Sequence, residues 1–163
     1  MFVSHRLVVA VVILLPLSPS VANAVDLVLV RKSAARLYLI EQGEVRKSYR
    51  VALGRNPVGH KQREGDKRTP EGRYILDYKK SDSAFHKAIH ISYPNRVDRL
   101  RAASQGTDPG GLIMIHGQKN GFGWLAEITQ RRHWTDGCIA VTNEQMDEIW
   151  DAVTVGTPIE IVP

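Results

Sequence analysis

Short apolar runs that alternate with polar residues are the strongest constraint on how this chain can fold. "VDLVLV" at positions 25–30 and "RLYLIEQGEVRKSYRVALG" from Arg36 onward both alternate as strands buried on at least one face do. Gln42-Gly43 divides the second run, and a pair of this kind is typical of a tight turn between antiparallel strands. The sequence therefore predicts an opening strand followed by a β-hairpin.

The rest of the chain continues mainly as strands. Further runs predict strands at Arg73–Lys79, Lys87–Tyr93, Gly111–Gly117 and 157–162. One helix is predicted between a capping box and a stop glycine; its signals are Thr142, Gln145, Met146, Ile149, Trp150, Val153 and Gly156. The basic stretch Arg55–Arg68 is expected to be an exposed loop. The predicted fold class is mainly β with one or two helices (α+β), and not a doubly wound α/β fold.

The first 24 residues are typical of a secretory signal peptide. His5 and Arg6 precede an apolar run from Leu7 to Leu17, and Ala22-Asn23-Ala24 supplies a small-x-small cleavage site. The apolar run is too short for a membrane-spanning helix, which needs about 20 residues. We therefore expect residues 1–24 to be removed, and residues 25–163 to form one exported domain, periplasmic or wall-associated, without stable membrane insertion.

The net charge of +5 leaves several partners open. A basic excess of this size suits nucleic acid, anionic lipid or an acidic polymer, and it is also common on an ordinary solvated surface. No helix-turn-helix, finger or RNP-like pattern is present in the sequence, so we expect no nucleic-acid partner.

The chain has a single cysteine, Cys138, in "RRHWTDGCIAVTN". Exported proteins mostly use cysteines in disulfide pairs, so an unpaired one is either a buried thiol or a reactive one. A reactive thiol needs a histidine to accept its proton and hydrogen-bond donors for the oxyanion formed on attack.

The histidines differ in their prospects. His60 lies in the basic loop and His133 is close to Cys138 in a flexible stretch, so neither is favoured as the base. His86 and His90 fall on a strand, too far apart for a metal pair, and no carboxylate or cysteine completes a zinc set. We therefore expect no metal and no cofactor. His116 ends a strand beside Gly117; taken alone it is more often a surface histidine than a catalytic one.

His116-Gly117 and the later "TDGC" together resemble the signature of the L,D-transpeptidase catalytic domain, or YkuD, family. "RTPEGRY" from Arg68, "HISYPN" from His90 and the closing "VGTPIEIV" resemble further segments of that family. The "HISYPN" segment is similar to a divergent branch that includes murein amidases and endopeptidases. The resemblance covers nearly all of residues 25–163 and implies the family's mixed β-sandwich fold.

The resemblance implies a role for each matching residue. Cys138 would be the nucleophile, His116 the general base, and the Gly117 carbonyl the group that orients the imidazole. The backbone amides of Gly137 and Cys138 would form the oxyanion hole, and a side chain at Gly137 would crowd the incoming carbonyl.

Two residues are expected to bind substrate, and two depart from the family pattern. Thr135 would bond to the substrate or to its own turn, and His90 is the second substrate-binding candidate. Asp136 stands where many members have histidine, and we expect its carboxylate to point away from the sulfur. Ala140 stands where members often have arginine or asparagine.

The family's reaction is acyl transfer on peptidoglycan stem peptides through a cysteine thioester. An amine of a second stem, or of a wall-attached lipoprotein, would accept the acyl group. Two alternatives remain open: a hydrolase that uses water as acceptor, cutting stems or releasing lipoprotein, and a cell-wall binding module with an inactive site. The basic residues Lys61, Arg63, Lys67 and Arg68 would lie beside the substrate groove or only in a solvated loop.

Overall fold

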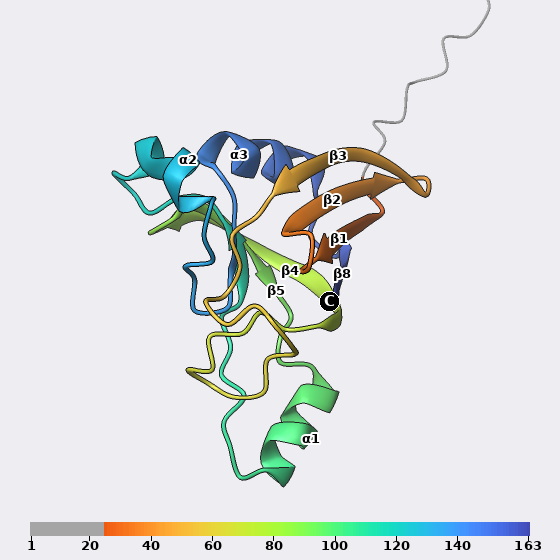
Figure 1. The fold of residues 1–163 in the computed structure, drawn as a ribbon. Helices are drawn as coiled ribbons and strands as arrows, with labels where there is room; N and C mark the ends of the chain where they lie inside the picture. The colour runs from red at the N-terminus through yellow and green to blue at the C-terminus, as the bar shows by residue number, and fades with distance from the viewer. Residues whose placement is uncertain (1–24) are drawn as a thin grey trace, which may run out of the picture.

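The computed structural model describes residues 25–163 (Figure 1), and the predicted signal peptide lies outside these residues. One eight-stranded sheet has the order β3-β2-β1-β8-β4-β5-β6-β7. Its strands are β1 (Leu27–Arg31), β2 (Arg36–Glu41), β3 (Glu44–Arg50), β4 (Gly72–Ser83), β5 (His86–Ile91), β6 (Met114–His116), β7 (Ile139–Ala140) and β8 (Pro158–Val162). The helices are α1 (Arg96–Ser104), the 3₁₀ turn η1 (Gly123–Leu125), α2 (Ala126–Thr129) and α3 (Asn143–Ala152).

The predicted hairpin is confirmed. β2 and β3 pair antiparallel around Gln42 and Gly43, which have φ angles of 53° and 81°. Positive φ at both positions is the geometry of a tight hairpin turn. β1 pairs antiparallel with β2 on one side and parallel with β8 on the other, so the sheet mixes both kinds of pairing.

Strand β4 joins the two parts of the sheet. Its first residues, from Gly72 to Ile75, pair with β8, whereas Leu76 to Ser83 pair with β5. Figure 1 shows β4 and β5 crossing the molecule beside the β1–β3 group, with α3 lying along the same side as β3. Buried side chains from both parts and from α3 form one hydrophobic cluster, which includes Val28, Leu37, Leu76, Ile89, Ile115, Met146 and Ile149. The predicted mainly-β class is confirmed.

Helix α3 begins where the sequence predicts. The Thr142 hydroxyl accepts a hydrogen bond from the Gln145 N–H, and the Gln145 side chain accepts one from the Thr142 N–H, each at 3.2 Å. This capping box satisfies two backbone donors that a helix start leaves without partners. The strand predicted at Gly111–Gly117 is shorter than expected, because only Met114–His116 is regular and Leu112 has a positive φ of 55°.

Helix α1 was not predicted from the sequence. It starts at Asn95, whose side chain accepts from the N–H groups of Val97 and Asp98, while the Asp98 carboxylate accepts from the Asn95 N–H. This Asn-x-x-Asp pair is a capping box and was the available signal. The helix has little apolar periodicity, because its buried residues are only Asp98 and Ala102.

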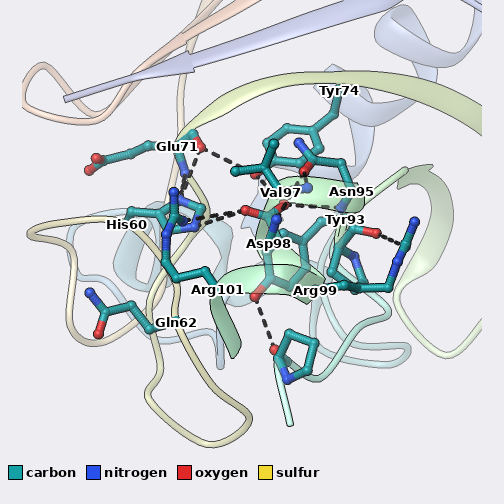
Figure 2. A network of polar contacts seen from close by, with 12 residues as sticks. His60, Gln62, Glu71, Tyr74, Tyr93, Asn95, Val97, Asp98, Arg99 and Arg101 are labelled. Carbon is teal, nitrogen blue, oxygen red and sulfur yellow. Dashed lines mark hydrogen bonds and ion pairs between the residues drawn. The ribbon is translucent and has the colours of Figure 1, made fainter. Parts of the chain in front are cut away.

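A buried polar network fixes α1 against the rest of the domain (Figure 2). The Tyr74 hydroxyl donates to Asp98 at 3.0 Å, and His60 Nε2 lies 3.0 Å from the other Asp98 oxygen. The Glu71 N–H donates to His60 Nδ1 at 3.0 Å. The place of His60 in a basic loop suggested a solvated side chain. This expectation is wrong, because His60 connects that loop to α1.

The stretch Arg55–Arg68 is irregular, as predicted, but its expected exposure is wrong at one position. Lys61 is only 3% exposed and forms an ion pair with Asp66 at 2.9 Å. Asp66 also accepts backbone hydrogen bonds from Gln62, Arg63 and Arg68, so this carboxylate organises the loop around itself. Among the described residues, no helix combines the length and the apolar character needed to cross a membrane.

Candidate active site

Parallel strands β6 and β7 bring His116 and Cys138 to one cleft. Ile115 pairs with Ile139 and His116 with Ala140, so Cys138 immediately precedes β7. His116 and Cys138 both line a cleft of about 440 Å³, together with Thr135 and Asp136. Residues that are distant in sequence are thus brought to the walls of one cleft by the sheet, as the two motifs predict.

His116 is held in the tautomer that a general base needs. Its side chain is 5% exposed, and Nδ1 lies 2.7 Å from the Gly117 carbonyl oxygen. Since a carbonyl only accepts, Nδ1 carries the proton and Nε2 keeps its lone pair. Burial lowers the pKa of His116 below its ordinary value, and the Gly117 bond only partly opposes this. The imidazole is therefore neutral at pH 7.

Two aromatic side chains enclose this imidazole. The Phe85 ring centre lies 4.7 Å from that of His116, and the Trp134 ring packs edge-on at 5.7 Å. Both residues line the cleft. The sequence did not indicate Phe85, which lies in the turn between β4 and β5, whereas Trp134 directly precedes "TDGC" and its position was a usable signal.

Gly117 is required by close packing. A Cβ at this position would lie 2.7 Å from Asn143 Oδ1 and 3.0 Å from the His86 Cβ. The Gln118 N–H, which belongs to the same peptide group as the Gly117 carbonyl, donates to Asn143 Oδ1 at 2.8 Å and so helps to fix the oxygen that holds His116. A larger residue would displace the group that orients the imidazole.

The Cys138 thiol is half-buried and protonated at neutral pH. Its sulfur lies 3.6 Å from the Leu112 carbonyl oxygen, to which the S–H donates. Burial is the main reason that the pKa of Cys138 is raised; the Asp136 charge raises it further, while the Met114 backbone and the Lys61 charge act in the opposite direction. The resting pair is a neutral thiol and a neutral imidazole.

The turn before Cys138 is organised by Thr135. Its hydroxyl donates to the Cys138 carbonyl at 2.7 Å and accepts from the Gly137 N–H at 3.2 Å. The structure thus favours the turn role over substrate binding for Thr135. Of the two amides expected in the oxyanion hole, that of Gly137 is occupied, whereas the Cys138 N–H has no acceptor within residues 25–163.

Gly137 has a further physical requirement that the sequence did not indicate. Its φ is +135°, and a Cβ there would lie 2.8 Å from the Arg68 carbonyl oxygen and 3.0 Å from Ile113 Cδ1. Glycine is therefore needed for the backbone conformation and for the approach of the basic loop, in addition to any crowding of a substrate carbonyl.

The remaining candidates lie outside the cleft lining or at its rim. His90 does not line the cleft; its Nδ1 is 2.6 Å from Asp77 and its ring stacks on Tyr78. The Asp136 carboxylate is 74% exposed and lies 3.6 Å from Arg55, but Asp136 also lines the cleft of Cys138, so its direction away from the sulfur stays a prediction. Ala140 is completely buried and pairs with Ala52 as well as His116.

Two other histidines have structural partners. His133 accepts a hydrogen bond from the Leu53 N–H at 3.1 Å, and His86 lies 2.7 Å from Asp147. In the part of the chain that the structure describes, no three histidine, cysteine or acidic residues are grouped so that they could hold a metal ion.

Comparison with known proteins identifies this arrangement. The model of the L,D-transpeptidase catalytic domain family, YkuD, matches residues 26–161. The chain belongs to this family. The YkuD assignment confirms the resemblance inferred from the His-Gly and Thr-x-Gly-Cys motifs, and the match covers the sheet and the cleft together.

Individual YkuD-like relatives support the same assignment. YafK of Escherichia coli (strain K12) is 35% identical over 116 residues, which is 70% of this chain and 39% of YafK. The helical cell shape determining protein Pgp2 of Campylobacter jejuni superposes with a TM-score of 0.64 at 28% identity, covering 86% of this chain and 48% of Pgp2. Bd1075 of Bdellovibrio bacteriovorus shares the fold, with a TM-score of 0.61 at 23% identity, covering 88% of this chain and 50% of that one. This YkuD chain thus spans half or less of the length of these relatives.

Proposed function

We propose that this protein is a cysteine acyltransferase that acts on peptidoglycan stem peptides in the cell envelope. The observation that carries the proposal is the placement of Cys138 and His116 in one cleft, with His116 Nδ1 bonded to the Gly117 carbonyl. This geometry leaves Nε2 to accept the thiol proton, which is the activation that a cysteine nucleophile needs.

The first half-reaction forms a thioester. Nε2 of His116 takes the proton of Cys138 as the sulfur attacks the carbonyl of the third stem residue. The oxyanion that forms is stabilised by the free Cys138 N–H. The tetrahedral intermediate then expels the terminal D-alanine, whose amine receives the proton from His116, so the proton count balances.

The second half-reaction transfers the acyl group. An amine of a second stem, or of a lysine on a wall-attached lipoprotein, attacks the thioester while His116 accepts its proton. Collapse of the intermediate releases the new amide and returns the thiol to Cys138. No metal or redox partner takes part in either half-reaction.

A second candidate is a hydrolase of the same family, with water as the acceptor. The departure at Asp136 and the divergent "HISYPN" segment favour this alternative. Both reactions share the thioester and the residues that form it. A binding module with an inactive site is disfavoured, because the complete Cys138–His116–Gly117 arrangement is present.

Incubation of the protein with tetrapeptide muropeptides, followed by mass analysis of the products, tests the proposal. Transfer gives cross-linked dimers with loss of D-alanine, and hydrolysis gives shortened stems or released peptides. Cys138→Ala serves as the control and should give neither. Unchanged muropeptides with the intact protein would contradict an enzymatic role and favour the binding module.

A further inference from the structure

We propose that a basic hollow beside the catalytic cleft, lined by Arg63, Lys67 and Arg68, binds a carboxylate of the stem peptide away from the bond that reacts. The inference rests on the proposed function and adds a substrate-recognition site to it. It holds for either acceptor, because both reactions begin with the same bound stem.

The hollow is connected to the cleft through shared walls. It has a volume of about 580 Å³, and it shares Gly65 and Lys67 with a second hollow of about 320 Å³. That second hollow shares Asp136 with the cleft of Cys138. The Arg68 carbonyl also packs against Gly137, so the basic segment directly borders the nucleophile turn.

The cations of the hollow have no internal counter-charge. Arg63, Lys67 and Arg68 form no ion pair with any acidic residue in the described range 25–163. Asp66 is the only acid in the wall, and its charge is already paired with the buried Lys61 ammonium at 2.9 Å. Lys61 therefore neutralises the one carboxylate whose negative charge would otherwise reduce the positive charge of the hollow.

The side chain of Arg68 has one donor that is buried and without an acceptor. Arg68 Nε is shielded from solvent and has no hydrogen-bond partner within residues 25–163. A buried N–H without an acceptor is unfavourable. Arginine pairs well with carboxylates in particular, because its planar donors match the two oxygens.

The position of Lys67 is fixed by its backbone. Its φ is +57°, a conformation that favours glycine or asparagine, and its carbonyl accepts from the Asn56 N–H at 3.0 Å. The close approach of Gly54 to the same carbonyl holds the segment further. A lysine in this strained conformation, on the wall common to both hollows, is consistent with a function for its side chain.

The anion expected in the hollow is a carboxylate of the stem peptide. Peptidoglycan stems carry carboxyl groups on glutamate and diaminopimelate in addition to the terminal alanine. A bound stem whose third carbonyl meets Cys138 extends beyond the cleft, and the basic hollow provides a cationic wall at the end of that extension, beyond Glu64 and Asp136 in the second hollow. The amide side chains of Asn56 and Gln105 line the same hollow and can hydrogen-bond the peptide backbone.

The test measures binding separately from turnover. In a Cys138→Ala background, the affinity for a stem tetrapeptide is measured by calorimetry with and without the double change Arg63→Gln/Lys67→Gln. We expect the double variant to bind on the order of tenfold more weakly or worse, since two charge-assisted contacts are lost. Arg36→Gln/Lys47→Gln removes the same charge on β2 and β3, at the opposite edge of the sheet, and should bind as the parent does.

Two modified peptides identify the carboxylate. A tetrapeptide amidated at glutamate and another amidated at diaminopimelate are titrated in parallel. The amidation that removes the bound carboxylate should weaken binding to the parent. It should also abolish the difference in affinity between the parent and the double variant. Equal affinity of parent and double variant for the unmodified peptide, or no binding of it at all, would overturn the inference.

The same data distinguish this inference from the proposed function. Carboxylate-dependent binding without turnover of muropeptides by the intact protein would support the hollow as a binding site and contradict the proposed enzymatic function. Turnover by the intact protein, together with an unchanged affinity of the double variant, would support the proposed enzymatic function and contradict the hollow as a binding site.

Discussion

At the scale of single residues, the two residues that we propose to exchange a proton, Cys138 and His116, are both neutral before substrate binds. Burial lowers the pKa of His116, and it raises the pKa of Cys138. These directions oppose a resting thiolate–imidazolium pair and place the proton transfer within the attack itself, as general-base catalysis requires. A protonated thiol is also the less reactive form toward stray electrophiles.

The first prediction follows from the raised pKa of Cys138. Alkylation of the substrate-free protein by iodoacetamide should increase with pH and reach half its maximum at a higher pH than for an exposed cysteine, because only the thiolate reacts. Mass analysis of the adduct at each pH gives the profile. A profile already at its plateau near neutral pH would indicate a resting ion pair and contradict the neutral pair.

Asp136→Asn should move that profile to lower pH by less than one unit. Removing the negative charge favours the thiolate, but the carboxylate is 74% exposed and solvent screens it strongly. The measurement is the same alkylation series. A shift of a full unit or more would place the carboxylate beside the sulfur and show that its outward direction is wrong.

Cys138→Ala should abolish turnover and leave the fold intact. The half-buried thiol makes one weak hydrogen bond, to the Leu112 carbonyl, so little of the free energy of unfolding depends on it. Product analysis and a thermal melt check the two parts. Retained activity would reject the cysteine mechanism, and a large loss of stability would indicate a structural thiol.

At the scale of elements, the basic loop and α1 depend on a few buried polar groups. Asp98 receives hydrogen bonds from Tyr74 and Asn95 and lies 3.0 Å from His60. Asp98→Asn replaces one acceptor oxygen by a donor and should lower the free energy of unfolding by about 3 kcal/mol. Denaturant melts check this, with the exposed Asp82→Asn as a control that should change little; equal stability of both would contradict a structural role for the network.

The nucleophile turn gives a second prediction at this scale. Gly137→Ala should reduce turnover on the order of a hundredfold, because its Cβ would press on the Arg68 carbonyl and displace Cys138. Gly156→Ala is a matched control, since Gly156 also has a positive φ (+96°) but open space around it. Similar losses of activity in both variants would attribute the effect to backbone strain in general.

Elements with local signals could be predicted from the sequence, and those that depend on distant partners could not. The hairpin at Gln42-Gly43 and the cap at Thr142 are set by neighbouring residues, and both are confirmed. Helix α1 was missed although its capping box is a local signal, because the helix lacks an apolar face and is anchored by a buried carboxylate that contacts residues far away in the chain. Lys61 was expected to be exposed, because burial of a lysine depends on a partner that composition does not reveal.

The candidate site likewise contains residues that local motifs predicted and residues that depend on distant parts of the chain. Cys138 and His116 were brought together by two motifs, and the sheet places them in one cleft. The aromatic wall at Phe85 depends on the turn between β4 and β5, and no local pattern indicates it. The occupied amide of Gly137 likewise depends on the orientation of the Thr135 hydroxyl.

At the scale of the whole molecule, one sheet supports both the core and the site. β4 connects the β8 side to the β5 side, and β6 and β7 continue from β5 to the edge where Cys138 lies. The bridge from Ala52 to Ala140 covers that edge. Cys138, the proposed nucleophile, thus directly precedes paired backbone, which holds a side chain in a fixed position better than a free loop does.

The predicted export also belongs to this scale. Cleavage after Ala24 should give a mature protein that begins at Val25, because Ala22-Asn23-Ala24 has the small residues that signal peptidase requires. N-terminal sequencing of protein from the cell envelope checks this. Protein recovered from the cell envelope that still begins at Met1 would contradict both the cleavage after Ala24 and the predicted signal peptide.

The most direct test of the central claim, that His116 activates Cys138 for attack on an acyl carbonyl, is acylation by a carbapenem followed by intact-protein mass spectrometry. The strained β-lactam carbonyl takes the place of the stem carbonyl, and the Cys138 N–H donates a hydrogen bond to the oxyanion. The account predicts one adduct on the peptide that contains Cys138, none with Cys138→Ala, and a rate on the order of a hundredfold slower with His116→Ala. An adduct that forms equally fast without His116, or that persists without Cys138, would contradict it.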